Sequence, residues 1–345
     1  MKNKYRYLKI LFLLFVFANS IMAGPKNKYG LSSAPELLIP VGSKSTALNG
    51  ANLANATGLD AIYWNPSGLT TLTGKTGEVL FSNQIYIADI DLNYFAGAYK
   101  VPSLGTFALT VNSLSFGDIP VTTILNPEGT GETYSPTFLT TGLTFARSMT
   151  DRIDFGTTVK LIYNKIAREE ASTVAFDFAL NYNVGSTGLQ FGVVLKNFGP
   201  GMTFTGQDLE QFYVPVGSQT GTPAEPRMTE LANFGLPTTL SLGLSYKFNL
   251  DKKNNLIGHT SYQNNSYASD DYNFGLEYNY NKIVFLRGAY QYTDDDAATS
   301  GFNGLSFGAG FNYAASSSLS IGFDYAYRSS DVFDANQIFT INLGF

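Results

Sequence analysis

The feature that most constrains this chain is a two-residue alternation of large apolar side chains with small or polar ones. Successive residues of a β-strand point to opposite faces, so this alternation places each set on its own face. Residues 174–184 keep it over eleven positions, the length of a tilted strand that crosses a membrane. The large residues of this segment are Val174, Phe176, Phe178, Leu180, Tyr182 and Val184.

A soluble β-sandwich also alternates, but its strands are usually shorter and its apolar face points inward. Here the apolar face is uniformly large, and the other face is mostly Gly, Ser, Asn and Ala, which suits a crowded barrel interior. Segments 240–248 and 319–328 repeat the pattern. The alternation therefore favours strands that span a membrane.

Composition supports the same fold class. Charged residues make up 14% of the chain, against roughly 25% in typical soluble domains. Beyond the N-terminus, no apolar run reaches the ~20 residues that a membrane-spanning helix needs. Because lipid leaves only helices and closed barrels as spanning structures, the sequence predicts a transmembrane β-barrel in a bacterial outer membrane.

Fourteen segments show the alternation, an even number as expected for a single-chain bacterial barrel. We therefore predict a fourteen-stranded antiparallel barrel. The segments span approximately 77–87, 90–100, 104–114, 137–148, 151–164, 171–184, 187–198, 236–248, 254–264, 270–280, 282–292, 303–314, 317–328 and 336–345.

The connections alternate in length, which tests the strand count independently. The short ones are 102–103, 150–151, 185–186, 249–253, 280–281 and 315–316. The other set includes the longer, polar connections 115–136, 199–235, 293–302 and 329–335. Short turns of such barrels face the periplasm and long loops face outward, so both ends of the barrel should lie on the periplasmic side.

Residues 1–23 have the pattern of a secretory signal peptide, with a basic head before the apolar run 10–17. We expect cleavage after Ala23, with Ser20 as the second choice; a buried N-terminal helix is the alternative. Cleavage would change the formal charge from −5 to −9, which disfavours a nucleic-acid partner. The chain has no cysteine, so a lipid anchor and disulfides are not expected.

Residues 24–76 do not alternate, and we expect them to form a hatch inside the lumen of the barrel formed by 77–345. Fourteen strands enclose more space than their own side chains fill. The small residues of 45–57 predict a short helix that ends at Gly58. Asn65 precedes a proline, so its backbone should be extended, and Gly68 follows in a sharp turn. The alternative is a periplasmic tail with an ordinary turn.

Two stretches resemble a known family. Gly42-Ser-Lys-Ser-Thr-Ala-Leu-Asn-Gly-Ala51 and Asp60-Ala-Ile-Tyr-Trp-Asn-Pro-Ser-Gly-Leu69 look like the N-terminus of PorV/PorQ-type proteins, within the superfamily of FadL-like outer-membrane barrels. This chain departs from the family pattern at Ser67, where Ala is usual, and at Asn49, where Gly or Met is common. The resemblance covers about thirty residues and agrees with the strand count.

The resemblance implies a fourteen-stranded barrel with an N-terminal hatch. For FadL-like members it implies passive passage of hydrophobic molecules, and for PorV/PorQ members a partnership with the type IX secretion apparatus and its cargo. The hatch element would be Trp64, Asn65, Pro66, Ser67 and Gly68. Trp64 would wedge the hatch against the wall, or simply pack there.

The connection 199–235 carries apolar side chains that either fold over the outer mouth to gather a ligand, dock a protein, or only pack the loop. These are Phe204, Phe212, Tyr213, Met228 and Phe234. The terminal strand ends on Phe345, which resembles the signal read by the barrel assembly machinery; its alternative is a last strand that happens to end in Phe.

The remaining groups of polar residues do not indicate a catalytic site. His259 shares a strand face with Ser261, too far for easy contact, so we interpret it as a polar lumen residue rather than a catalytic base. The pairs and triplets of Asp at 270–271 and 294–296 suit a solvated loop better than a calcium site, because they lack calcium-loop spacing. Charges on lumen faces should pair: Lys160, Asp177, Lys196, Lys247, Glu277, Arg287, Asp324 and Arg328.

We therefore expect a non-enzymatic outer-membrane protein without a cofactor or metal. Its expected partners are outer-membrane lipid, the assembly machinery, and secretion components or their cargo. The alternative function is passive transport of a hydrophobic ligand.

Overall fold

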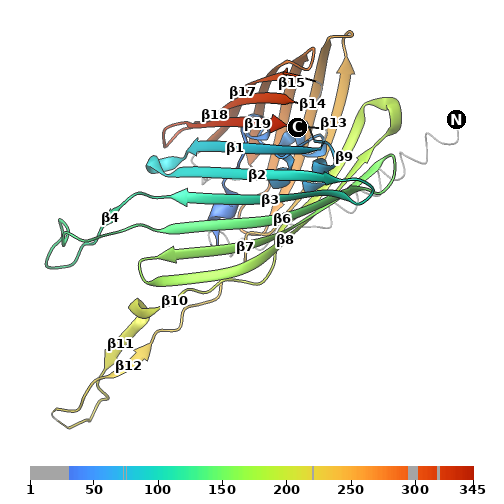
Figure 1. The fold of residues 1–345 in the computed structure, drawn as a ribbon. Coiled ribbons are helices and arrows are strands. Elements are labelled where there is room, and N and C mark those ends of the chain that lie inside the picture. Colours follow the sequence, from blue (N-terminus) through green and yellow to red (C-terminus); the bar gives the residue numbers. More distant parts are fainter. Residues whose placement is uncertain (1–30, 73, 75, 220, 294–301, 317–318) are drawn as a thin grey trace.

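The computed structural model describes residues 31–72, 74, 76–219, 221–293, 302–316 and 319–345. Fourteen antiparallel strands form one closed wall (Figure 1). They are β1 (Gly77–Ile85), β2 (Asp91–Val101), β3 (Gly105–Ser115), β6 (Thr137–Ser148), β7 (Ile153–Ile166), β8 (Glu169–Asn183), β9 (Leu189–Phe198), β13 (Thr239–Asn249), β14 (Asn254–Asn265), β15 (Asp271–Tyr280), β16 (Val284–Thr293), β17 (Phe302–Ala314), β18 (Ser320–Ser330) and β19 (Asn336–Gly344).

The wall closes because β1 pairs with β19 and β8 pairs with β9. The predicted fourteen-stranded antiparallel barrel is therefore confirmed. Five short strands belong to the long loops: β4 (Ile119–Pro120), β5 (Thr133–Tyr134), β10 (Thr205–Gly206), β11 (Glu210–Tyr213) and β12 (Glu225–Met228). Three short 3-10 helices lie in connections: η5 (Ile87–Asp89), η6 (Gly185–Thr187) and η7 (Gln207–Leu209).

The two faces of the wall differ as the alternation predicts. In β8, Asp177 and Ala179 are buried, whereas Phe178 is 42% exposed and Leu180 is 48% exposed. Large apolar side chains thus cover the outside of the barrel, where hydrocarbon can replace water. Within the described parts of the chain, no helix combines the length and hydrophobicity required to span a bilayer.

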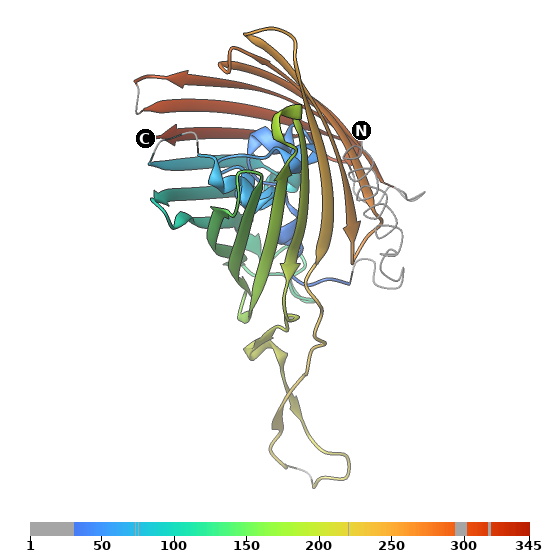
Figure 2. The same ribbon diagram turned by 90° about the vertical axis from the view of Figure 1, so that its right-hand side faces the viewer.

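Residues 31–72, here called the inner segment, lie inside the barrel (Figure 2). Its elements are η2 (Pro35–Leu38), α2 (Ser43–Thr46), η3 (Ala51–Ala54), α3 (Ala61–Trp64) and η4 (Pro66–Thr70). Near one end, the Ser33 N–H donates to the carbonyl oxygen of Gly235 at 3.0 Å, beside the long 199–238 loop. Beyond the other end, the Thr76 N–H donates to the Phe345 carbonyl at 2.8 Å. The segment therefore crosses the lumen from the long-loop end to the short-turn end.

The single helix predicted for 45–57 is wrong. Two separate turns, α2 and η3, replace it, because Asn49 (φ 47°) and Gly50 (φ 71°) adopt left-handed backbone between them. A left-handed pair ends one helical turn and redirects the chain before the next begins. The resulting kinked path follows the curved inner wall, which one straight helix could not. The predicted signal peptide, 1–23, lies outside the described residues.

Glycines on the wall let the inner segment lie directly against it. A Cβ added at Gly156 of β7 would be 2.3 Å from the backbone carbon of Pro66. At Gly243 of β13 it would be 3.0 Å from the Ala54 nitrogen, and at Gly308 of β17 it would be 2.4 Å from the Ala47 Cβ. Since real Cβ contacts are not that short, any larger residue there would displace the segment.

Candidate functional site

The side chain of Asn65 forms four hydrogen bonds inside the barrel. The residue is fully buried, with the extended backbone (φ −156°) expected before a proline. Its Nδ2 donates to the Leu53 carbonyl at 2.7 Å and to Asn181 Oδ1 of β8 at 2.8 Å. Its Oδ1 accepts from the N–H and the hydroxyl of Ser67, at 3.1 and 2.6 Å. One amide thus joins η3, η4 and the wall, with both donors used.

The remaining turn residues are packed without free space. Pro66 begins η4, where a missing N–H costs nothing. Gly68 lies so close to the inner segment that an added Cβ would be 2.1 Å from the Ala56 carbonyl oxygen. Ser67, the departure from the family pattern, contributes a hydroxyl bond to Asn65 and so adds to the turn.

Trp64 makes most of its contacts within the inner segment. Its Nε1 donates to the Val41 carbonyl at 3.1 Å, and its ring lies against Gly50, where a Cβ would be 2.4 Å away. On the wall, Lys196 of β9 lies nearby, with its Nζ 5.6 Å from the ring centroid of Trp64. The wedging role of Trp64 stays a prediction.

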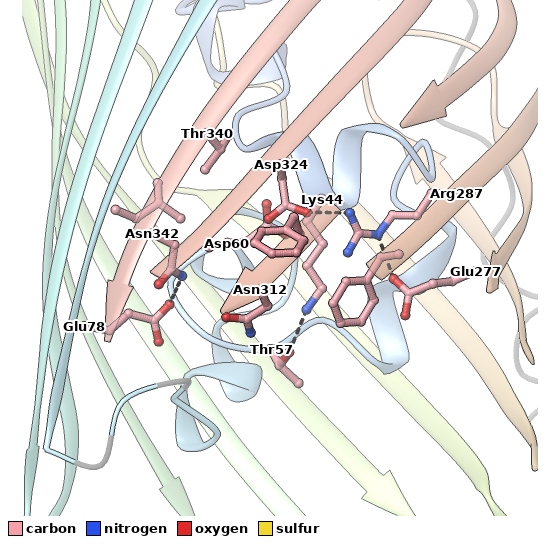
Figure 3. A pocket seen from close by; sticks show the side chains of 14 residues that line it. Lys44, Thr57, Asp60, Glu78, Glu277, Arg287, Asn312, Asp324, Thr340 and Asn342 are labelled. Carbon is pink, nitrogen blue, oxygen red and sulfur yellow. Dashed lines mark hydrogen bonds and ion pairs between the residues drawn. The ribbon is translucent and has the colours of Figure 1, made fainter. Parts of the chain in front are cut away.

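A cavity of about 90 Å³ separates the inner segment from β1 and β15–β19 (Figure 3). We call it the inner pocket. Arg287 binds two wall carboxylates, with Nε 2.7 Å from Glu277 and a terminal nitrogen 2.6 Å from Asp324. From the inner segment, Lys44 Nζ donates to Thr57 at 2.8 Å. Glu78 also lines the pocket and is bonded to the Asn342 side chain.

Asp60 is the carboxylate that the inner segment adds to this pocket. Burial raises the pKa of Asp60 to about 6, and the charge of Lys44 and a hydrogen bond from Ser45 only partly oppose that rise. Its Oδ1 is buried and makes no hydrogen bond within the described parts of the chain. The carboxylate is therefore easier to bury protonated than charged.

Other lumen charges lie nearer the long loops. Lys160 Nζ is 2.6 Å from Asp177 Oδ2, as expected for a buried pair. Lys196 Nζ instead lies 4.5 Å from the ring centroid of Tyr63, and the Arg328 guanidinium lies 4.0 Å from that of Phe302. The expectation that lumen charges pair is thus met for Lys160, Asp177, Glu277, Arg287 and Asp324.

The 199–235 connection projects from the barrel as a two-stranded ribbon, β11 and β12, rather than folding over the mouth (Figures 1 and 2). Phe212 is 74% exposed and Met228 is 60% exposed. Tyr213 lies against Arg227, 4.3 Å from ring centroid to guanidinium carbon. Phe204 differs because it is half-buried beside Met202, and Phe234 bridges to Met202 at the base of the loop.

His259 has a partner that the sequence did not indicate. Its Nδ1 lies 2.8 Å from Ser245 Oγ, because the register of β13 and β14 sets these residues opposite each other. Ser261 instead donates to the Gly50 carbonyl. Both members of the pair are buried. Lys44 and Asp60 were not predicted as site residues, although each is a lone charge among small or apolar neighbours in the sequence.

The acidic residues at 270–271 and the C-terminal Phe345 were also singled out in the sequence. Asp270 accepts from Tyr262 and Asn264, and Asp271 from Gln291 and Thr293. The 294–296 run lies outside the described residues. Phe345 continues β19 through hydrogen bonds with Gly77, N–H to carbonyl at 2.9 Å in both directions, and so joins the two end strands.

Residues 133–345 match the family described as the type IX secretion system membrane protein PorP/SprF. The chain belongs to this family. The match covers more than half of the chain and leaves the inner segment outside it. The family matched is PorP/SprF, whereas the sequence resemblance pointed to PorV/PorQ. No curated protein matches the chain.

Among solved structures, the toluene transporter TbuX of Ralstonia pickettii is 14% identical, with TM-score 0.53, covering 88% of this chain and 98% of its own. The Pseudomonas putida toluene transporter TodX is 12% identical (TM-score 0.49, coverage 86% and 96%). A FadL homologue of Pseudomonas aeruginosa is also 12% identical (TM-score 0.44, coverage 94% and 98%).

Because the sequence identity to TbuX is only 14%, this similarity shows that the two proteins share a fold and nothing more. This PorP/SprF-family member is therefore a closed fourteen-stranded β-barrel of the outer membrane, with a fold similar to that of TbuX.

Proposed function

We propose that this protein is a non-enzymatic component of type IX secretion-linked export or surface attachment, with a role of the PorV/PorQ kind. Membership of the PorP/SprF family supports the secretion link. The proposed partners are secretion components or secreted cargo on the outer side, in addition to outer-membrane lipid.

The observation that carries the proposal is the way the inner segment occupies the lumen. Asn65 is bonded to β8 in a fully buried position, and Gly156 leaves no space between β7 and the η4 turn. The inner pocket is small and lined by several charged side chains, which suits no hydrophobic cargo. We infer that the inner segment is a fixed hatch, so the partner binds to the outside of the barrel.

The ribbon of β11 and β12 is the proposed contact surface. All eight residues of these two strands are exposed, and two-stranded ribbons are marginally stable alone. Phe212 and Met228 expose large apolar side chains far from the wall, where lipid does not cover them. Such side chains become buried when a partner protein binds.

The test replaces Phe212 and Met228 with serine and measures surface display of a type IX cargo in the native host. We expect display to fall at least tenfold with the barrel still assembled. The matched control replaces Ile124 and Leu125, which are 100% and 89% exposed on the β4–β5 loop. Unchanged display in the ribbon variant would contradict the proposal.

Mass spectrometry of the gently purified protein separates the alternative function. A stoichiometric secretion component or cargo without an enriched lipid supports export or attachment. An enriched hydrophobic molecule without a protein partner would instead indicate passive transport.

We also propose that Phe345 is part of the signal read by the barrel assembly machinery. The paired, apolar end strand supports this reading. Phe345→Ser should lower the amount of folded barrel, whereas the neighbouring outward residue Leu343→Ser serves as the control.

A further inference from the structure

A groove of about 600 Å³ lies on the outside of the barrel wall, over strands β13–β17. We call it the outer groove. The register sets Gly258 of β14, Leu276 of β15 and Gly288 of β16 side by side across the wall. A Cβ added at Gly258 would be 4.0 Å from the outward side chain of Leu276. One added at Gly288 would be 3.6 Å from the outward ring of Phe307. Both glycines therefore face outward, and the missing side chains on either side of Leu276 hollow the outer surface.

The lining of the outer groove is aliphatic and aromatic. No Asp, Glu, Lys or Arg is among the described residues that line it. Six large side chains of the lining remain between 39% and 57% exposed: Tyr246, Phe248, Phe274, Leu276, Tyr290 and Leu305. The inner pocket, by contrast, is lined by four carboxylates and two cations. Of these two cavities, the outer groove is the one that suits a hydrocarbon ligand.

Tyrosines on both sides of the outer groove indicate its depth in the membrane. Toward the long loops, Tyr272 lies between Tyr262 and Tyr292, with ring centroids 5.2 and 6.2 Å apart. Toward the short turns, β15 ends at Tyr280, which is 43% exposed. Aromatic side chains gather at the two edges of the apolar band of membrane barrels. Leu276 lies four positions from Tyr272 and four from Tyr280, so the groove lies in the middle of this band.

Its depth determines what can fill the outer groove. Apolar walls without partner atoms lose dispersion contacts, and water does not fill a space that offers it no polar partners. At the level of Leu276 the surrounding medium is the hydrocarbon of the bilayer. The two gaps flank a single leucine side chain, and a flexible hydrocarbon chain can enter them while a flat barrel wall cannot.

We propose that the outer groove binds an acyl chain of an outer-membrane phospholipid, which stays on the barrel when bulk lipid is exchanged for detergent. The proposal is independent of the docking function, because the groove lies on the wall and not on the ribbon. It is also distinct from passive transport, since the lipid is held outside the barrel and does not pass through the lumen.

Photolabelling of the parent protein tests where the lipid is held. The full chain is reconstituted in phosphatidylethanolamine vesicles that contain the same lipid with a diazirine on its acyl chain. The barrel is extracted into detergent before illumination, so that only lipid that stays bound reacts. We expect labels on 244–248, 274–276 and 288–290 at least tenfold above those on the outward residues of β1–β3. Even labelling around the wall would overturn the proposal.

Filling the groove tests the two glycines. Native mass spectrometry counts the phospholipid retained by the parent and by the double variant Gly258→Leu, Gly288→Leu. We expect at least a tenfold loss of retained lipid, because the added side chains occupy the space beside Leu276. The matched control is Gly97→Leu on β2, an outward glycine whose nearest neighbour, Val79, would be 3.9 Å from the new Cβ. Heat-modifiable gel migration confirms that each barrel has assembled.

The outcomes separate the possible occupants. Undiminished lipid on the assembled double variant would overturn the proposal. A second barrel or another protein retained by the parent in place of lipid would also overturn it and would identify a protein contact. If the double variant does not assemble, the labelling pattern of the parent decides alone. Cargo display should be unchanged in the assembled double variant, so the test does not depend on the proposed function.

Discussion

Two groups of charged side chains in the lumen, those of the inner pocket and those nearer the long loops, are stabilised in different ways. The inner pocket brings four carboxylates, Asp60, Glu78, Glu277 and Asp324, to two cations, Lys44 and Arg287. Arg287 is paired with two of these carboxylates, Glu277 and Asp324. Nearer the long loops, Lys196 and Arg328 face aromatic rings and form no ion pair within the described residues. We infer that the ion pairs of Arg287 contribute more to stability than the two cation–π contacts do.

The inner segment is attached to the wall of the barrel on two sides. Backbone contact at Gly156 and the hydrogen bonds of Asn65 hold it on the β7–β8 side. On the opposite side, Ser43 donates its hydroxyl to the Ile338 carbonyl at 2.9 Å and Ser306 donates to the Ala47 carbonyl at 3.0 Å. Attachment on both sides holds the inner segment in place across the lumen.

The largest expected effect comes from detaching the inner segment from the wall. Gly156→Val would force its side chain into the Pro66 backbone, 2.3 Å from the new Cβ, so the η4 turn must leave the wall. We expect a barrel that still assembles but conducts ions in planar bilayers, unlike the parent protein. Gly258→Val is the matched control, because a Cβ there faces outward and has its nearest neighbour at 3.9 Å. A closed, fully folded Gly156→Val barrel would show that the segment is not held at this contact.

Arg287 and Arg328 test the difference between ion pairs and a cation–π contact directly. Arg287→Met leaves Glu277 and Asp324 without their cation, and breaking a buried pair typically costs about 3–5 kcal/mol. Arg328→Met removes only a cation–π contact, worth about 0.5–2 kcal/mol. Urea-induced unfolding should therefore show a much larger loss for Arg287→Met. Equal losses would mean that Arg328 contributes as much to stability as the paired Arg287 does.

The sequence predicts features that depend on neighbouring residues, but not those that depend on how distant strands are aligned. The wall follows from the alternation, because one period fixes both the strand and its inward face. The partner of each inward charge depends on register, which the sequence does not state. Arg287 meets Glu277 because they are opposite in β15 and β16, and it reaches Asp324 across β17 where Gly310 leaves room. Ser245 and His259 meet for the same reason.

The sequence indicated where the inner segment lies, but not the course that its backbone follows. Its small residues and the Asn65–Pro66 pair indicated a compact, turn-rich piece distinct from the strands. The left-handed backbone at Asn49, which splits the expected helix, is selected by fit to the wall rather than by local propensity. The contact of Ala54 with Gly243 joins positions nearly two hundred residues apart, so no local pattern could reveal it.

A smaller effect is expected at the Asn65 turn. Asn65→Ala removes both donors and the acceptor that join η3, η4 and β8, so we expect a loss of about 3 kcal/mol. Ser67→Ala removes one hydroxyl bond and should cost about 1 kcal/mol. Trp64 emission, followed through a urea titration, reports when the inner segment leaves its site. A cost of Ser67→Ala equal to that of Asn65→Ala would show that the hydroxyl, not the amide, organises the turn.

The smallest expected effect is a pH dependence that belongs to the inner pocket alone. Burial raises the pKa of Asp60 from 3.8 to about 6, so the folded protein binds this proton more tightly than the unfolded chain does. Stability from this group is therefore present at about pH 4 and is lost as the pH rises through 6, by about 2 kcal/mol. Asp60→Asn should remove this part of the slope.

Glu36 also has a pKa raised by burial, and its contribution remains in both proteins. The difference between the two slopes therefore isolates Asp60. Urea midpoints of the parent and of Asp60→Asn at pH 4.5 and pH 7.5 provide the measurement. Parallel slopes would place the proton of Asp60 outside the folding equilibrium, and the inner pocket would then hold its carboxylates charged, with Lys44 and Arg287 as sufficient counter-ions.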